Sequence, residues 1–307
     1  MKLVRFIQRK SALGDVLWME PVIRELAKQC ILVVVITPYA KLFDNYPLKN
    51  VIIKEKLDPI LKIVREISKA VLGGFGFIDL GGSYEKYPKI HILQAYFNTA
   101  KCSNTPLSYP QLYPSHSSTL PASKYVVLHL HAPSSQKNYR TIAGIDWSVI
   151  RKWFETRGYV VVGISDSEDN QLLYSKQISP SITELIDIIN NCELFIGLDS
   201  GPSHIAAALK RPSIIFFGSV NPLLRHIPDQ FNGVFMQNTC EFSGCYHEFL
   251  DNEQRCCRFV SDDVPAPCCC FSTDEIIDVI SQQLKISSNG SDLNPLPVIN
   301  ELKDHLC

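Results

Sequence analysis

The sequence lacks long apolar runs and dense runs of a single charge. No apolar stretch approaches the roughly 18–20 residues of a membrane-spanning helix. The opening "MKLVRFIQRK" leads directly into a pattern typical of a folded domain, so we expect no signal peptide. Lysine and arginine are nowhere dense enough to indicate nucleic-acid binding. With 46% hydrophobic and 20% charged residues among 307, the composition is that of an ordinary globular protein.

The net charge is close to zero, at −1, but it is unevenly distributed. Residues 1–120 contain 16 lysines and arginines against 9 aspartates and glutamates, a net charge of +7, which leaves −8 for residues 121–307. A basic half is typical of proteins that meet an anionic partner, such as a phosphorylated molecule or a membrane surface. The alternative is charge scattered over a solvated surface.

Short apolar runs alternate with segments of helical period, which predicts an α/β fold with parallel, doubly wound sheets. We expect strands at residues 3–8, 31–37, 75–82, 125–131, 159–165, 193–198 and 214–219. We expect helices at residues 16–30, 58–72, 83–99, 146–158, 181–192, 203–209 and 272–285. Pro21 must lie in the first turns of its helix or kink it, and Ser181 with Glu184 forms a capping-box pattern.

The chain is long enough for two domains. Residues 101–123 are rich in proline and serine and show neither a helical nor a strand period, so we interpret them as the junction between the two domains. We therefore predict a domain at 1–120, a second at 121–285, and a polar tail at 286–307.

Residues 194–219, "LFIGLDSGPSHIAAALKRPSIIFFGS", contain a strand, a turn and a helix. Asp199 or Ser200 can cap the helix, and Gly201 permits a ligand to approach the backbone closely. Ligands of open α/β sheets bind at the carboxyl ends of strands, and the N–H groups at a helix start attract anions. The pattern therefore indicates a phosphate site, the alternative being a well-formed helix start without a ligand.

The second apolar run of this stretch ends in Gly218 and Ser219 and repeats the pattern. Two adjacent strand ends with small residues favour a diphosphate. The glycine-rich residues 73–82, "GGFGFIDLGG", precede or end a strand instead of opening a helix, which argues against a nicotinamide-dependent oxidoreductase.

Eleven cysteines are many for a chain without an export signal, and seven lie between residues 240 and 270. In that setting a disulfide framework is the weaker interpretation. The spacing suits a metal site with four ligands, for which His247 is a further candidate. It does not distinguish zinc from iron. Buried, redox-inert thiols are the alternative. The candidate ligands are Cys240, Cys245, Cys256 and Cys268.

Three segments occur in the order typical of one family: "SALGDVLWMEPVIREL" at 11–26, "FIDLGG" at 77–82 and "SITELIDIINNCELFIGLDSGPSHIAAALKRPSIIFFGSVNP" at 181–222. They resemble glycosyltransferase family 9, the lipopolysaccharide heptosyltransferases. The resemblance implies a GT-B fold, with two Rossmann-like domains whose parallel sheets face a central cleft. It places the acceptor on the N-terminal domain and the nucleotide sugar on the C-terminal one. Related autotransporter heptosyltransferases carry an iron-binding finger.

The resemblance also implies roles for single residues. Asp15 matches the proposed general base, with Ser11 and Gly14 on the acceptor side; the alternative is that Asp15 caps its helix. The implied donor-binding residues are Lys137, Glu168, Asp199, Ser200, Gly201, His204, Gly218 and Ser219. Among these, His204 could equally be packed in the core, and Glu168 could be an exposed loop acid. The surroundings of Lys137 depart from the family, so Arg140 is a substitute for it.

The implied function is inverting transfer of a heptose or related sugar from an ADP-sugar to an anionic glycan or lipopolysaccharide-type acceptor. No Asp-x-Asp signature is present, so we expect no cofactor for the transfer, and zinc or iron only at the cysteines. We expect a cytoplasmic enzyme in contact with the inner membrane face and not with nucleic acid. Val220 and Asn221 stand where threonine and aspartate are common, which leaves the donor open. The alternative is a catalytically inactive GT-B protein that binds a nucleotide sugar or acts as a scaffold.

Overall fold

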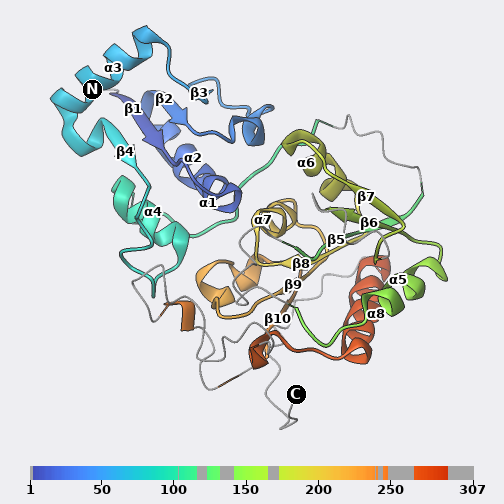
Figure 1. Ribbon diagram of the computed structural model, residues 1–307. Helices are drawn as coiled ribbons and strands as arrows, with labels where there is room; N and C mark the ends of the chain where they lie inside the picture. The colour runs from blue at the N-terminus through green and yellow to red at the C-terminus, as the bar shows by residue number, and fades with distance from the viewer. Residues whose placement is uncertain are drawn as a thin grey trace. The chain divides into compact units, whose positions relative to one another are not determined.

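The computed structural model describes residues 3–102, 104–115, 123–131, 142–164, 173–238, 240, 245–247 and 266–289. The chain divides into two compact units, Met1–Ser115 and His116–Cys307. Each unit contains one parallel sheet (Figure 1). Within the described residues, no helix is both long enough and apolar enough to cross a bilayer.

The first unit is built on a four-stranded parallel sheet in the order β3-β2-β1-β4. The two central strands are short apolar runs, as parallel strands buried on both faces usually are. Helix α3 packs on β1 and β4 through a cluster that includes Phe6 and Val34. The elements are β1 (Leu3–Gln8), α1 (Leu13–Leu17), α2 (Glu20–Gln29), β2 (Cys30–Ile36), the 3-10 turn η1 (Ala40–Phe43), β3 (Val51–Lys54), α3 (Pro59–Leu72), η2 (Gly73–Phe75), β4 (Phe77–Asp79) and α4 (Ile92–Ala100).

Two helices of this unit differ from the sequence prediction. The helix expected at 16–30 is split into α1 and α2, and Pro21 is the second residue of α2, where its missing N–H costs nothing. The helix expected at 83–99 forms only from Ile92, because Pro88 interrupts the earlier part and the His91 ring caps the start. His91 Nδ1 accepts from Leu93 N at 3.1 Å.

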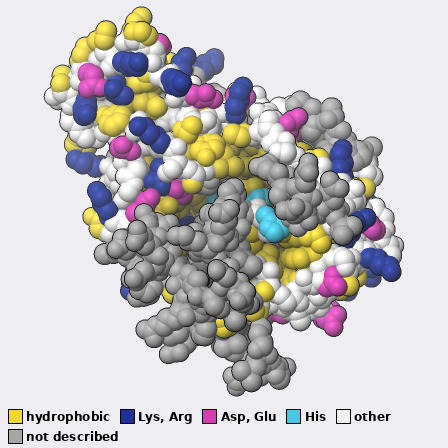
Figure 2. Space-filling view, in the orientation of Figure 1, with side chains coloured by type: hydrophobic (Ala, Val, Ile, Leu, Met, Phe, Trp, Pro, Cys, Tyr) yellow, Lys and Arg dark blue, Asp and Glu magenta, His cyan; other side chains and the backbone are white. Residues whose placement is uncertain are grey.

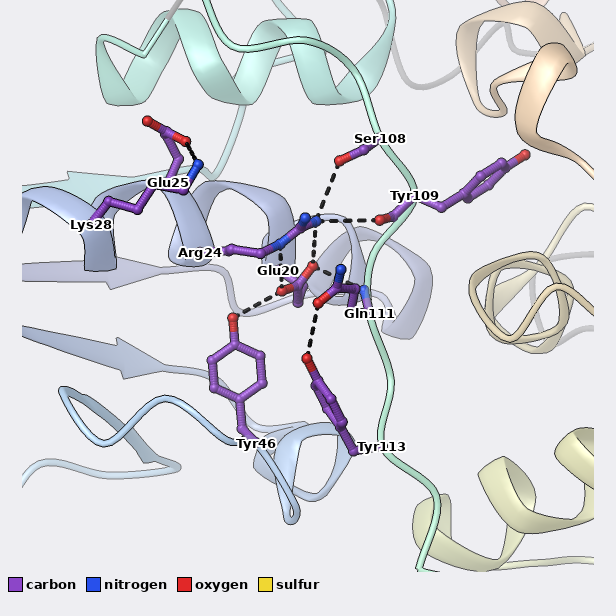
Figure 3. A network of polar contacts seen from close by, with 9 residues as sticks. All are labelled: Glu20, Arg24, Glu25, Lys28, Tyr46, Ser108, Tyr109, Gln111 and Tyr113. Carbon is purple, nitrogen blue, oxygen red and sulfur yellow. Dashed lines mark hydrogen bonds and ion pairs between the residues drawn. The ribbon is translucent and has the colours of Figure 1, made fainter.

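The predicted junction is tied to the first unit by a buried carboxylate (Figure 3). Glu20, on α2, is fully buried and accepts four hydrogen bonds. Its donors are Arg24 Nε at 3.2 Å, Arg24 Nη2 at 3.1 Å, Tyr46 Oη at 2.9 Å and Gln111 N at 2.9 Å. Arg24 also donates to Ser108 and to the carbonyl of Tyr109. The chain that leaves α4 is therefore held against α2 as far as residue 111.

The second unit is built on a six-stranded parallel sheet in the order β10-β9-β8-β5-β6-β7. Strands β5 and β8 are neighbours at its centre, so their carboxyl ends lie side by side. The elements are β5 (Tyr125–His129), α5 (Trp147–Glu155), β6 (Val160–Ile164), β7 (Lys176–Ile178), α6 (Ile182–Asn191), β8 (Leu194–Leu198), α7 (Gly201–Ala208), β9 (Ser213–Phe216), η5 (Pro222–Leu224), η6 (Pro228–Gln230), β10 (Gly233–Met236), η7 (Cys245–His247), η8 (Pro267–Cys269) and α8 (Thr273–Asn289).

Helix ends in the second unit follow the local signals in the sequence. The capping box of α6 is formed: Ser181 N donates to Glu184, whose backbone N–H donates to the Ser181 hydroxyl. Helix α8 continues to Asn289, beyond the start predicted for the polar tail, and residues 290–307 lie outside the described part.

Candidate functional site

Asp15 lies in the turn that follows β1, at the carboxyl end of the strand. It is the third residue of α1, whose N-cap position is occupied by Ala12. Ala12 has φ 60° and ψ 125°, a conformation that non-glycine residues rarely adopt. Strained backbone of this kind persists where the surrounding structure holds it, and it clusters at functional sites. Of the other acceptor-side residues, Ser11 is exposed and Gly14 is buried.

The Asp15 carboxylate is held by two side chains, one from the residue after β1 and one from the segment after β4. Arg9 donates to Oδ2 through Nη2, and the Tyr84 hydroxyl donates to the same oxygen at 3.1 Å. The hydroxyl of Tyr96, on α4, donates to the backbone carbonyl of Asp15 at 3.3 Å. These contacts fix the orientation of the carboxylate.

Arg9 is the centre of this group, and the sequence analysis did not identify it. It also donates to Glu85 Oε1 at 3.0 Å and to the carbonyl of Leu80 at 2.9 Å. Burial lowers the pKa of the guanidinium, but the charges of Tyr96, Asp15 and Glu85 outweigh it and raise the pKa above its ordinary value. Arg9 is therefore a permanent cation between two carboxylates.

In the second unit, the Asp-Ser-Gly-Pro turn lies between β8 and α7, as predicted. Asp199 is buried, whereas Ser200 and Gly201 are partly exposed at the start of α7. Ser200 Oγ lies 3.1 Å from Nδ1 of His129, the last residue of β5. The side chain of Ser203 accepts from Ser200 N at 3.1 Å. The turn is thus fixed from the neighbouring strand and from within the helix.

Asp199 belongs to a buried group with two histidines. His204 Nε2 lies 3.7 Å from Asp199 Oδ1, and the His204 ring stacks on His226 with centroids 4.6 Å apart and planes 18° apart. His226 in turn packs among Phe217, Phe231 and Phe235. His204 is therefore packed in the interior and also lies beside Asp199 of the candidate site. The sequence analysis gave two interpretations, a packed core residue and a donor-binding residue, and its surroundings are compatible with both.

Of the described residues, Asp199, His204 and His226 bring three potential metal-ligand atoms within 4.8 Å of one another. An imidazole binds a metal through a lone pair in the plane of its ring. Because these two rings are nearly parallel, their lone pairs cannot converge on one ion unless a ring rotates. The arrangement therefore suits hydrogen bonding to a ligand better than a preformed metal site.

The second strand end differs from the prediction in one respect. Gly218 and Ser219 follow β9 and are buried, but no α-helix begins there. Pro222 instead starts the short turn η5, so the predicted repeat of the strand, turn and helix pattern is wrong in its last element. Gln237 donates to the carbonyls of Gly218 and Val220, and Tyr246 N donates to the Ser219 carbonyl at 3.1 Å. The loop at residues 218–220 is therefore held in place by Gln237, which follows β10, and by Tyr246 of η7.

Two predicted donor residues, Lys137 and Glu168, lie outside the described residues, as does the substitute Arg140. Their assignments stay predictions.

The cysteine cluster contains three buried thiols, Cys245, Cys268 and Cys269, against which the partly buried Cys240 packs. The Sγ atoms of Cys268 and Cys269 are 3.9 Å apart, and their hydrogen bond, together with burial, raises the pKa of Cys268. Soft thiol donors of this kind fit zinc or iron. Cys256 lies outside the described residues, so the four-ligand site stays a prediction.

One family model matches a part of the chain that lies almost entirely in the second unit. Residues 114–241 match the profile of glycosyltransferase family 9 (heptosyltransferase). Lipopolysaccharide heptosyltransferase 3 of Escherichia coli is 30% identical to this chain over 146 residues, which are 43% of this chain and 40% of that protein. The chain thus spans less than half the length of this curated relative.

Solved structures resemble the whole chain. TibC of enterotoxigenic E. coli, an iron-containing dodecameric glycosyltransferase, has a TM-score of 0.71 at 17% identity, covering 93% of this chain and 78% of its own. A second TibC structure, in complex with ADP-D-β-D-heptose, also has a TM-score of 0.71, at 16% identity, covering 95% of this chain and 81% of its own. ADP-heptose lipopolysaccharide heptosyltransferase II of E. coli has a TM-score of 0.61 at 14% identity, covering 94% of this chain and all of its own. At these identities the likeness shows the fold alone.

The predicted fold class, α/β of the GT-B type with two parallel sheets, is confirmed. The fold and the sequence matches together confirm the resemblance of this chain to glycosyltransferase family 9, the heptosyltransferases of lipopolysaccharide biosynthesis.

Proposed function

We propose that this protein is an inverting glycosyltransferase that transfers a heptose or related sugar from an ADP-sugar to an anionic glycan or lipopolysaccharide-type acceptor. The observation that carries the proposal is the turn at 199–201, which opens α7 at the carboxyl end of β8 inside the family match. The matched E. coli relative is a lipopolysaccharide heptosyltransferase, which supports this donor and acceptor class.

The second unit would bind the nucleotide sugar at this turn. The backbone N–H groups at the start of α7 point toward any ligand there, and the positive end of the helix dipole favours a diphosphate. Ser200 and Gly201 would supply backbone donors, and Asp199 would accept from sugar hydroxyls. His129 and His204 lie beside the turn and can add hydrogen-bond donors as negative charge develops on the leaving group.

Asp15 would act as the general base. The acceptor hydroxyl loses its proton to the carboxylate as its oxygen bonds to the anomeric carbon. The bond between that carbon and the diphosphate breaks, and the ADP leaves with the electron pair. Inversion requires the base on the side of the anomeric carbon opposite the diphosphate. Arg9 and Tyr84 support this role because they hold the carboxylate in one orientation.

We propose further that the transfer needs no metal, since helix N–H groups and cationic side chains can stabilise the diphosphate. Transfer that persists in excess chelator would support this point.

The proposed setting is the cytoplasmic side of the inner membrane, where a lipid-linked acceptor would be available. Asn221 accepts from Leu223 N at 2.9 Å and caps η5. Because its side chain is engaged in this cap, the identity of residue 221 does not indicate which sugar the donor carries.

The test is a donor screen in which mass spectrometry detects sugar transfer or slow donor hydrolysis. Calorimetric titration with ADP, UDP, GDP and NAD identifies the nucleotide that the protein binds. We expect ADP to bind, with an Asp199→Asn variant binding an ADP-sugar more weakly and the exposed control Asp229→Asn binding normally. Binding of UDP would correct the donor, and binding of NAD alone would overturn the proposal. Donor binding without transfer or hydrolysis would indicate the inactive, scaffold alternative.

A further inference from the structure

His226 is an imidazole in the interior of the second unit, and its ring contacts two segments of the candidate donor site. One face stacks on the ring of His204, near the start of α7. Phe217, which directly precedes Gly218, meets the His226 ring edge-on, with centroids 5.7 Å apart and planes 87° apart. One side chain thus joins the start of α7 to the residues that follow β9.

The remaining contacts of His226 hold its ring in place. The Phe231 and Phe235 rings lie 5.7 and 5.2 Å from it between centroids, and these two phenylalanines stack on each other at 4.3 Å. The backbone N–H of His226 donates to the carbonyl of Pro222 at 2.8 Å. Both the ring and the backbone of this residue are therefore fixed by their surroundings.

His226 is too deeply buried to touch a ligand itself. In Figure 2, histidine side chains (cyan) reach the surface beside hydrophobic ones, and His131 is an exposed histidine. His226, by contrast, is 1% exposed. Any effect of this side chain on a bound donor must therefore pass through the residues that it contacts.

The contact with His204 leads to the candidate sugar-binding carboxylate. His204 Nε2 lies 3.7 Å from Asp199 Oδ1. Rotation of the His204 ring about its Cβ–Cγ bond would carry Nε2 away from Asp199. It would also drive the edge of that ring into His226, whose centroid is 4.6 Å away, and a closely packed interior resists such a clash. The stack therefore fixes the orientation in which His204 faces the carboxylate.

We propose that His226 is a positioning residue for the donor sugar. Through the stack it holds His204, and through His204 it holds Asp199 in the orientation that accepts from the sugar hydroxyls. The inference rests on the proposed function, which assigns the sugar to Asp199 and the diphosphate to the backbone of Ser200 and Gly201. Loss of the stack should therefore weaken binding of the sugar and spare binding of the nucleotide.

The experiment is calorimetric titration of the full chain with ADP and, separately, with ADP-heptose. His226→Leu and His226→Met remove the ring and place a non-planar apolar side chain among the phenylalanines. His226→Phe keeps a planar ring and removes both ring nitrogens. The matched control is Phe231→Leu, which changes the same aromatic cluster at a ring that packs on His226 and Phe235. Circular dichroism verifies that each variant folds.

We expect the two ring-free variants to bind ADP-heptose about tenfold more weakly than the wild type and ADP within about twofold, since a displaced group loses the contacts that its position allowed. His226→Phe should bind both ligands like the wild type, because its ring can stack on His204. Phe231→Leu should unfold at a lower urea concentration and keep the wild-type ratio of the two affinities.

Three outcomes would overturn the proposal. Equal weakening of ADP and ADP-heptose in the ring-free variants would show a general loss of structure, and unchanged affinities would show no role. A His226→Phe variant that behaves like the ring-free ones would assign the effect to the ring nitrogens, through a hydrogen bond or a metal, instead of the stack. These outcomes leave the proposed function intact, whereas a wild type that binds neither ligand would contradict the proposed function and this inference together.

Discussion

Arg9 and Asp15 form an ion pair in which the guanidinium side chain is 3% exposed and the carboxylate side chain 17%. The arginine directly follows β1 and the aspartate lies in α1, so the pair closes the turn between the two elements. The same arginine contacts Glu85, 76 residues further on, at 3.0 Å. One buried cation thus joins the candidate base to the segment that follows β4.

We predict that Asp15→Asn folds but loses transfer. The amide keeps the shape of the carboxylate and cannot accept a proton at neutral pH, so kcat/KM should fall by about 100- to 10,000-fold. The affinity of the second unit for ADP, measured by calorimetry, should not change. Asp44→Asn is the control, because this exposed aspartate pairs with Lys41 at the surface. Turnover retained by Asp15→Asn would remove the base assignment.

Arg9→Lys tests whether the arginine positions Asp15. Lysine keeps the charge, but its single ammonium group cannot reproduce the fork that contacts Asp15, Glu85 and Leu80 together. We expect kcat to fall about tenfold or more while KM for the donor stays constant, since small displacements of a catalytic group are costly. The neighbouring Lys10→Ala, at an exposed site, is the control. A variant with lower stability and normal kcat would show a structural role only.

Most of the order of elements could be predicted from the sequence because it follows from local patterns, whereas the short strands β3, β7 and β10 were not predicted. Alternating strand and helix periods indicated two parallel sheets, and the Ser181–Glu184 pair marked a helix start that is formed. The prediction was wrong where a helical pattern of side chains ran through a proline, as at Pro88. Period alone does not show which part of such a segment is helical.

The candidate sites were only partly predictable, for a different reason. Asp15 and Asp199 lie in contiguous motifs and could be found by resemblance. Glu85 and His226 reach their sites only through the tertiary fold, and nothing in their local sequence indicates it. The signal for His129 was present in principle, because it lies near the end of the strand predicted at 125–131. The order of strands that places β5 beside β8 could not be read from the chain.

Glu20→Gln should destabilise the first unit strongly. The fully buried carboxylate accepts from Arg24, Tyr46 and Gln111, and an amide would turn an N–H group toward one of these donors while leaving the arginine charge without its partner. We expect the free energy of unfolding to fall by about 3–5 kcal/mol, measured in urea. Glu25→Gln, on the same helix, removes the Glu25–Lys28 surface pair shown in Figure 3 and should cost less than about 1 kcal/mol. Similar losses in both variants would contradict this account.

The second unit should lose stability at alkaline pH through Tyr174. Burial raises the pKa of its phenol to about 12, from an ordinary value of 10.0. Because the folded pKa is the higher one, the stability from the neutral phenol is fully present below pH 10 and is lost as the pH rises toward 12. The Tyr174 hydroxyl has no hydrogen-bond partner within the described residues, so Tyr174→Phe should unfold at an unchanged or higher urea concentration at neutral pH. Its stability should fall less between pH 10 and 12; parallel curves for variant and wild type would refute the assignment.

Metal analysis of protein purified without an affinity resin tests the cysteine cluster. The clustered thiols of Cys240, Cys245 and Cys268 fit a zinc or iron ion, which would bind them as thiolates and release their protons. We expect close to one equivalent of metal per chain, lost together with thermal stability on treatment with a strong chelator. Cys268→Ser should lower the metal content, whereas Cys192→Ala, at an isolated buried thiol of the same unit, should not. Visible thiolate-to-iron absorption would distinguish iron from colourless zinc. Fewer than about 0.2 equivalents of any transition metal would mean that these cysteines are packed thiols and that their spacing has no bearing on metal binding.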